Sequence, residues 1–341
     1  MNLKTYFIKY SWLIPMPFTL LMKFYSKKII FPFYHSTSNV QPKFIKHLYS
    51  VKSITEFKKD IYFLLKYFKS ISIEDFVKYT KGEFVITEDS FLLSFDDGLS
   101  ALNEIVPFLI DNKISALFFL NNDFVNNKDL FYRYKVSLVI DRIHNSKISK
   151  LKKLELKKVL GYDFINRNEI IDSLKKFTHK NINQIDELAI ILNFSFKDFL
   201  LNEKPYLTEK QINVLIKNGF YFGGHGCSHA NYQLLNENDQ ITETLKSVNY
   251  VEARFKSKYR FFSFPFSDDN ISLKIFEYLK FEKIISFGTA GLKDEAKKNI
   301  THFQRVPMEY DVNYSAESIL KGELLYYLIK NIIGKNKTNR S

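Results

Sequence analysis

Apolar residues follow two different periods along the first third of the chain. Phe57 to Phe68 has apolar positions three or four residues apart, which predicts an amphipathic helix with a Thr55 hydroxyl near its start. Phe91 to Phe95 and Ser115 to Leu120 are short apolar runs of the kind that form buried strands. Leu99 to Asn112 lies between them and reads as helical. This alternation predicts a parallel sheet or barrel in an α/β fold.

The pattern changes between residues 131 and 205, where Lys-rich and Leu-rich helical segments dominate and no strand is predicted. We interpret 131–205 as an inserted helical subdomain that interrupts a main domain formed by 29–130 and 206–325. Residues 1–28 form an apolar and basic N-terminal segment, and 326–341 form a C-terminal tail. The insertion has a structural role in the simplest interpretation. A lid or recognition element is the alternative, because long insertions are often functional.

Two carboxylates, Asp96 and Asp97, directly follow the apolar run that ends at Phe95, and Gly98 allows a sharp turn after them. The carboxyl end of a strand is where α/β folds carry catalytic residues. Adjacent buried carboxylates are costly unless a positive charge lies beside them. A divalent cation meets that need by binding one and leaving the other free as a base. A solvated Asp-Asp-Gly turn is the alternative.

Two histidines, His225 and His229, follow a second apolar stretch. On a helical turn, residues four apart share a face and can chelate one ion, while a pair of surface or capping histidines is the alternative. A carboxylate and two imidazoles are a ligand set for zinc or another first-row metal with open positions. We therefore expect a divalent metal ion as cofactor, with zinc preferred over cobalt or nickel.

These stretches, with two further ones at Phe261–Asp269 and Phe303–Glu309, resemble in their order the polysaccharide deacetylase family, the NodB homology domain of carbohydrate esterases. Ser94 to Gly98 is similar to the first family motif, Thr/Ser-Phe-Asp-Asp-Gly, and His225 to His229 to the second, His-Ser/Thr-x-x-His. Phe264-Pro265-Phe266 resembles a third-motif loop that walls the substrate groove, and Tyr34-His35 resembles the opening strand. The resemblance covers about residues 29 to 310, apart from the insertion. It implies a distorted (β/α) barrel of the polysaccharide deacetylase type.

The resemblance also implies a function: a metal-dependent hydrolase that removes N-acetyl groups from amino sugars of a polysaccharide or glycan precursor. The metal would polarise the acetamide carbonyl, and a backbone N–H near Phe266 would be a second oxyanion donor. The implied site residues are Asp96 as general base, Arg305 as the residue that orients it, Asp97, His225 and His229 as metal ligands, and Phe264, Pro265, Phe266 and His35 as substrate contacts.

Two departures from the family pattern leave alternatives open. The usual C-terminal Leu-His-Asp motif, which supplies a catalytic acid, is absent. His302 is the only histidine after His229, and we assign it a catalytic role. His35 is the other candidate for the acid. Alternatively, His302 is a polar loop residue without a catalytic role. Arg260 competes with Arg305 for the role beside Asp96. The missing acid favours an alternative function, a deacetylase-like domain that binds glycan without hydrolysis, whereas the intact Asp96 disfavours it.

The net charge of +13 changes this picture little, because the lysines are scattered and no nucleic-acid-binding motif is present. We expect a carbohydrate partner and no nucleic acid, and we keep peripheral contact with an anionic membrane as a secondary interpretation. Ser11 to Met22 is apolar but shorter than the about 20 residues that span a bilayer. We interpret it as an interfacial or core-packed segment of a cytoplasmic protein. A single cysteine excludes an intramolecular disulfide framework. Nothing in the pattern predicts an oligomeric state.

Overall fold

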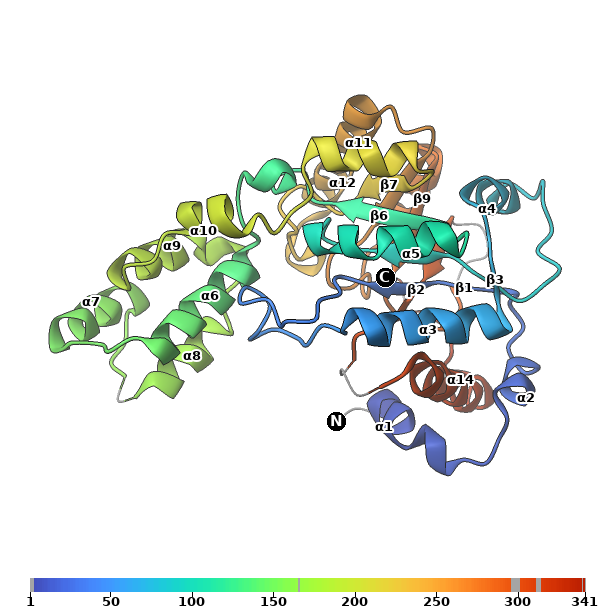
Figure 1. Cartoon of the computed structure of the whole chain (residues 1–341), viewed down its shortest axis with the longest axis horizontal. Helices are drawn as coiled ribbons and strands as arrows, with labels where there is room; N and C mark the ends of the chain where they lie inside the picture. Colours follow the sequence, from blue (N-terminus) through green and yellow to red (C-terminus); the bar gives the residue numbers. More distant parts are fainter. Residues whose placement is uncertain (1–2, 165, 296–300, 311–313, 339, 341) are drawn as a thin grey trace.

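The computed structural model describes residues 3–164, 166–295, 301–310, 314–338 and 340. Parallel strands form a large sheet and a small one, surrounded by helices (Figure 1). The strands are β1 (Ile29–Ile30), β2 (Pro32–Tyr34), β3 (Lys69–Ser70), β4 (Ser90–Phe91), β5 (Leu93–Phe95), β6 (Ala116–Leu120), β7 (Tyr221–Gly224), β8 (Arg260–Ser263), β9 (Ile284–Gly288), β10 (His302–Gln304) and β11 (Val306–Pro307). The α-helices are α1 (Leu3–Tyr10), α2 (Phe18–Met22), α3 (Ile54–Tyr67), α4 (Ile73–Thr80), α5 (Val106–Asp111), α6 (Tyr132–Asn145), α7 (Lys150–Leu160), α8 (Arg167–Leu174), α9 (Ile182–Ile191), α10 (Phe196–Glu203), α11 (Glu209–Lys217), α12 (Glu237–Phe255), α13 (Leu273–Phe281) and α14 (Ala316–Ile332).

The large sheet is a nearly closed barrel of eight parallel strands in the order β10-β9-β8-β7-β6-β5-β2-β11. Its two edge strands, β10 and β11, are consecutive in the chain and only Arg305 separates them. All carboxyl ends of the strands therefore lie at one rim, where a (β/α) barrel carries its site. The expected fold class, a distorted (β/α) barrel of the polysaccharide deacetylase type, is confirmed.

Aromatic side chains fill the barrel wall on both sides because successive residues of a strand point to opposite faces. Leu117 and Phe119 of β6 belong to the buried cluster that contains Phe261 and Phe287 from neighbouring strands. The residue between them, Phe118, belongs instead to the core between barrel and helices. Continuous apolar runs such as β6 thus reflect burial on both faces, as in other parallel sheets.

Residues 132–203 form the helices α6 to α10, which project as an arm from one side of the barrel (Figure 1). Their buried apolar cluster includes Val139, Ile143 and Leu188 and also takes in Phe44 and Leu99 of the main domain. The first helix of the arm, α6, begins directly beside the barrel rim and so brings insertion residues close to the strand ends.

Several element boundaries differ from the sequence-based prediction. The predicted strand 115–120 is β6, but the predicted strand 91–95 is divided at Leu92 into β4 and β5, and β4 joins the small sheet β1-β4-β3. The cap of α3 is Ser53, which forms a reciprocal capping box with Glu56, rather than Thr55. Helix α14 continues to Ile332, beyond the predicted start of the tail at 326. Among the described residues no helix combines the length and apolar character needed to cross a membrane.

Candidate metal centre and active site

The two carboxylates Asp96 and Asp97 follow β5 and are almost fully buried, with 2% and 5% exposure. Asp97 has a φ of 67° and Gly98 a φ of 63°, so the chain turns sharply directly after Asp96. A left-handed conformation is unusual for a residue with a side chain and is found mostly at constrained sites. This turn lets two adjacent carboxylates reach different partners.

Asp96 is paired with Arg305, which is fully buried inside the barrel. The Nη1 and Nη2 atoms of Arg305 donate to Oδ1 and Oδ2 of Asp96, each at 2.7 Å. The same guanidinium lies over the ring of Phe33 at 4.2 Å and donates to the hydroxyls of Ser94 and Ser263. Burial alone raises the pKa of Asp96, but the charge and hydrogen bonds of Arg305, together with the charges of the nearby histidines, outweigh it, and the pKa lies below its ordinary value. Asp96 is therefore ionised.

The other arginine considered from the sequence, Arg260, lies away from the two aspartates. Its guanidinium binds Glu282 and Glu252 at the opposite, amino end of β8. The geometry therefore places Arg305 beside Asp96 and excludes Arg260 from that position.

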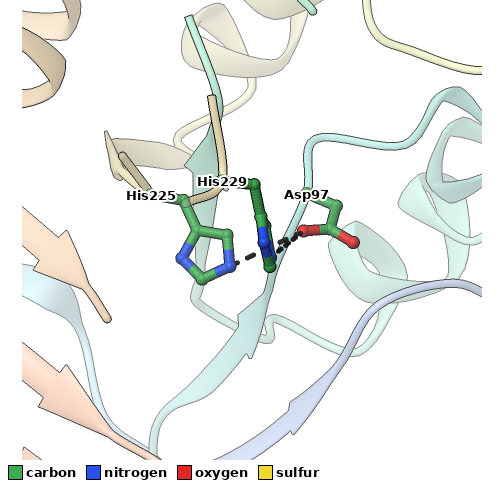
Figure 2. A group of neighbouring side chains, drawn as sticks. All are labelled: Asp97, His225 and His229. Atoms are coloured by element: carbon green, nitrogen blue, oxygen red, sulfur yellow. Dashed lines mark ion pairs between the residues drawn. The ribbon is translucent and has the colours of Figure 1, made fainter. Parts of the chain in front are cut away.

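Asp97, His225 and His229 turn their ligand atoms toward one point (Figure 2). Nε2 of His229 lies 3.2 Å and Nε2 of His225 lies 3.6 Å from Oδ1 of Asp97. The described surroundings provide no hydrogen-bond partner for this buried Oδ1. An unpaired buried carboxylate oxygen is costly, and a cation among the three atoms would satisfy it. One carboxylate oxygen and two imidazole nitrogens with open positions fit zinc or a similar divalent ion.

Neighbouring groups fix the orientation of His225. Its Nδ1 lies 2.8 Å from the backbone oxygen of Ser263, so Nδ1 carries the proton and Nε2 keeps its lone pair. Burial lowers the pKa of His225 to about 4, so the ring is neutral at physiological pH. A neutral imidazole with a fixed tautomer is the form that binds a metal ion.

The histidine pair does not lie on a helical turn, contrary to the sequence-based argument. His225 follows β7, and residues 225–230 form a loop in which Gly226 has a φ of 74° and His229 a φ of 55°. The ring of His229 is held between Phe131 and Phe266, with centroid distances of 4.2 and 4.8 Å. Loop geometry and ring packing, rather than helical periodicity, bring the two Nε2 atoms together.

A cavity of about 340 Å³ opens above these residues. Its walls come from strand ends, from the loop before α3 and from α6, and it is large enough for a sugar residue. The lining residues are Phe33, His35, Leu48, Tyr49, Asp96, Asp97, Phe131, Arg133, Tyr134, His225, His229, Phe264, Phe266, Thr289 and Pro307.

The predicted groove wall is only partly exposed to this cavity. Phe264 and Phe266 line it, whereas Pro265 is buried and is absent from the described lining residues. Phe266 has a φ of 59°, and in the described part of the chain its backbone N–H has no hydrogen-bond partner. A free N–H at the cavity wall is available to an anionic oxygen.

His35 lines the cavity and is bound to Glu309, a residue not assigned a role from the sequence. Nδ1 of His35 lies 2.7 Å from Oε2 of Glu309, and the His35 backbone N–H donates to the same oxygen. Burial opposes the charged ring, but the hydrogen bond and charge of Glu309 outweigh it and raise the pKa of His35 to about 9. His35 therefore carries a proton at neutral pH.

His302 is not brought to the cavity, which corrects its assignment as a catalytic residue. Its Nε2 lies 3.0 Å from Oδ2 of Asp268 and its Nδ1 lies 2.8 Å from Oγ of Ser286. Arg340 also binds Asp268, at 2.6 Å. His302 thus belongs to a buried ionic cluster at the amino end of β10, and its side chain has no surface exposed to the cavity.

The insertion contributes residues that no motif indicated. Tyr134 of α6 donates its hydroxyl to Oδ2 of Asp97 at 2.6 Å, which leaves Oδ1 directed toward the histidines. Phe131 contacts His229, and the guanidinium of Arg133 lies over the ring of Phe266 at 5.7 Å. The amino end of α6 is therefore part of the site.

Comparison with known proteins gives the family. The family described as polysaccharide deacetylase matches residues 86–282, more than half of the chain and a region that contains Asp96, Asp97, His225 and His229. No curated protein matches the sequence.

Among solved structures, the chain is similar to the Streptococcus pyogenes deacetylase PplD in complex with acetate, with 13% identity, 86% of this chain and 97% of that chain covered, and a TM-score of 0.54. It is also similar to IcaB from Ammonifex degensii, with 14% identity, coverage of 87% and 97%, and a TM-score of 0.52. A polysaccharide deacetylase from Bacillus cereus matches at 12% identity, coverage of 86% and 68%, and a TM-score of 0.52. At this identity the likeness concerns the fold, whereas the family match covers the motifs: the chain belongs to the polysaccharide deacetylase family and is a carbohydrate deacetylase.

Proposed function

We propose that this protein uses a divalent metal ion, with zinc preferred, to remove N-acetyl groups from amino sugars of a polysaccharide or glycan precursor. The observation that carries the proposal is the unequal environment of the adjacent aspartates. Asp97 converges with two imidazoles, whereas Asp96 is ionised and is paired with an arginine instead. A metal site with a free carboxylate beside it suits hydrolysis.

Asp97, His225 and His229 would hold the ion, which when bound supplies Lewis-acid polarisation of the acetamide carbonyl. Asp96 accepts the proton of the attacking water, because each of its oxygens keeps a lone pair beyond its bond to Arg305. Arg305 fixes the plane of the carboxylate. The N–H of Phe266, a residue that lines the cavity, would donate to the developing oxyanion.

His35 supplies the acid that the missing Leu-His-Asp motif left unassigned. The carbon–nitrogen bond of the acetamide breaks, and the amine nitrogen takes the proton that His35 holds beside Glu309. The products are acetate and a free amino sugar. A protonated imidazole that lines the cavity together with Asp96 supports hydrolysis over a glycan-binding domain without hydrolysis.

The test uses Asp96→Asn, Asp97→Asn and His35→Gln, with acetate release from acetylated chito-oligosaccharides and bound metal both measured. Asp96→Asn should keep its metal and lose about 10²- to 10⁴-fold in turnover, the usual worth of a general base. His35→Gln should show a loss within the same range with metal retained. Asp97→Asn should lose metal. His144→Gln, at an exposed position on α6, is the matched control and should keep both properties.

Two results would contradict the proposal. If Asp96→Asn hydrolysed substrate at the wild-type rate, Asp96 would not be the base. If the wild-type protein released acetate equally well before and after metal removal by a chelator, the reaction would not depend on a metal.

A further inference from the structure

The N-terminal part of the chain holds large apolar side chains in solvent. Leu3 and Tyr6 of α1, Trp12 and Leu13 of the following 3-10 turn, and Leu20 and Phe24 in and after α2 are between 40% and 71% exposed. We call these six residues the N-terminal apolar face. The carboxyl end of α14, the helix that packs on α1, also exposes Ile332 and Ile333. All six residues of the face lie within residues 3–24, and exposed apolar residues concentrated in one segment mark an interaction site more often than single ones do.

This face is held in a fixed orientation by α14. Ile8, on the opposite side of α1, is fully buried against Gly322, where an added Cβ would lie 2.5 Å from the Cα of Ile8. Lys4 pairs with the buried Glu323 at 2.9 Å, and Lys321 donates to the backbone oxygen of Ile14. Figure 1 shows α1 lying along α14. The exposed side chains therefore belong to a docked segment whose inner side is already satisfied.

Basic residues outnumber acidic ones around this face. Residues 1–55 contain eight lysines and no Asp or Glu, and no acidic residue follows Glu323. Lys9 and Lys23 flank the apolar side chains, and in the described part of the chain neither has a carboxylate partner. A second copy of the chain docked on this face would bring lysines against lysines, whereas a negatively charged surface would neutralise them.

We propose that the N-terminal apolar face docks the protein onto the surface of an anionic lipid bilayer. Tryptophan and tyrosine are enriched at the membrane–water interface, where an apolar body and a polar tip are both satisfied. Lysines beside such residues add attraction to anionic headgroups. Buried apolar area and basic charge together are what peripheral membrane helices use.

The chain contains a convenient reporter, because Trp12 is its only tryptophan. The experiment mixes the full chain with phosphatidylcholine vesicles with or without phosphatidylglycerol and records tryptophan emission and co-sedimentation. With phosphatidylglycerol, the emission of Trp12 should shift to shorter wavelength, and brominated lipid should quench it. With phosphatidylcholine alone in high salt, both effects should be much smaller.

Two pairs of variants isolate the face. Trp12→Ser/Leu13→Ser should reduce co-sedimentation at least about tenfold, whereas Phe281→Ser, which removes a 79% exposed side chain on α13, should not. Lys9→Gln/Lys23→Gln should weaken binding about 25-fold, because each lysine near an anionic surface contributes about fivefold. Lys210→Gln/Lys217→Gln, an exposed pair on α11, should bind as the wild type does.

Unshifted emission and no co-sedimentation with anionic vesicles would overturn the proposal. It would equally be overturned if the wild type formed dimers in sedimentation velocity and Trp12→Ser/Leu13→Ser were monomeric, because a second copy of the chain would then be the occupant. Melting temperatures of all variants are measured first. Folding defects are not expected, since every substituted side chain is exposed.

Discussion

Asp97 shows how a residue far away in the chain sets the chemistry of a motif. One of its oxygens accepts from Tyr134, and the other is left for the position where a metal ion would bind. Partners of this kind orient metal ligands, and their loss commonly lowers metal affinity by about 10- to 100-fold. Tyr134 is therefore a positioning residue of the proposed metal site.

We predict that Tyr134→Phe lowers metal affinity about 10- to 100-fold, measured by competition with a chromogenic chelator. Tyr132→Phe is the matched control, because Tyr132 is a buried tyrosine on the same helix but does not line the cavity. Equal metal affinity in Tyr134→Phe and wild type would show that the hydroxyl does not orient Asp97.

His35 gives a pH dependence with a defined sign. Its folded pKa is about 9, above the ordinary value of 6.5. The protonated ring therefore stabilises the folded state fully below pH 6.5, and this contribution is lost as the pH rises through about 9. Because the His35 side chain is 28% exposed, we expect about 2 kcal/mol, less than the full shift would give.

Thermal denaturation between pH 6 and about pH 10 checks this prediction. The difference in melting temperature between wild type and Glu309→Gln should be large at pH 6 and should shrink toward pH 10, since the variant cannot hold the proton on His35. A difference that is independent of pH would contradict a raised pKa of His35.

At the residue scale, the sequence predicts local motifs and misses long-range partners. Short motifs contain Asp96, Asp97, His225 and His229, and the residue types in these motifs indicate a metal site and a base. Glu309 and Tyr134 belong to no such motif. Their roles depend on contacts with His35 and Asp97, which lie 274 and 37 residues away in the chain. His302 was misplaced for the same reason, since its partner Asp268 is 34 residues distant.

At the scale of the element, β7 depends on the absence of side chains. An added Cβ at Gly224 would lie 2.5 Å from Oγ and 3.0 Å from the carbonyl carbon of Ser247, so α12 packs directly on the strand. His225 follows at once, and any displacement of β7 moves this proposed ligand. The sequence presents these glycines as the end of an apolar run, and only the packing explains them.

We predict that Gly224→Ala destabilises the protein by about 1–3 kcal/mol, the usual cost of overpacking. Adding Ser247→Gly should restore part of the loss by removing the nearest contacts, although Ser247→Gly alone costs about 0.5 kcal/mol in a helix. Denaturant unfolding of the two single variants and the double variant measures this coupling. Strictly additive losses would mean that Gly224 and Ser247 do not compete for space.

Strands and helices of the barrel could be predicted where one pattern dominates over five or more residues, as in β6 and α3. The predicted element boundaries were wrong where tertiary contacts determine them. Leu92 interrupts a continuous apolar run because β4 pairs with β1 and β3, while β5 pairs with β2 and β6. The conformation of the histidine loop was not predicted because Gly226 and His229 have positive φ angles and the ring of His229 packs against Phe131 and Phe266, which lie far away in the sequence.

On the scale of the whole molecule, the described end of the chain is tied to the wall of the active-site cavity. Arg340 binds Asp268 and Glu295, and Asp268 accepts from the backbone N–H of Thr289, which lines the cavity. Burial raises the pKa of Asp268, but the hydrogen bond and charge of His302 and the charge of Arg340 outweigh it, so the pKa lies below its ordinary range. The stability that this carboxylate contributes is present above about pH 4 and is lost as the pH falls further.

We predict that Arg340→Gln lowers the stability at pH 7 by about 3–5 kcal/mol, because a buried carboxylate loses its cation. Arg254→Gln is the matched control, since it breaks an arginine–glutamate pair at the surface, and its melting temperature should change little. The difference between Arg340→Gln and wild type should decrease below pH 4, where protonation of Asp268 removes the advantage of the wild type. If Arg340→Gln melted at the wild-type temperature at pH 7, the C-terminal end would be a solvated tail, and the cavity wall would owe its position to the barrel alone.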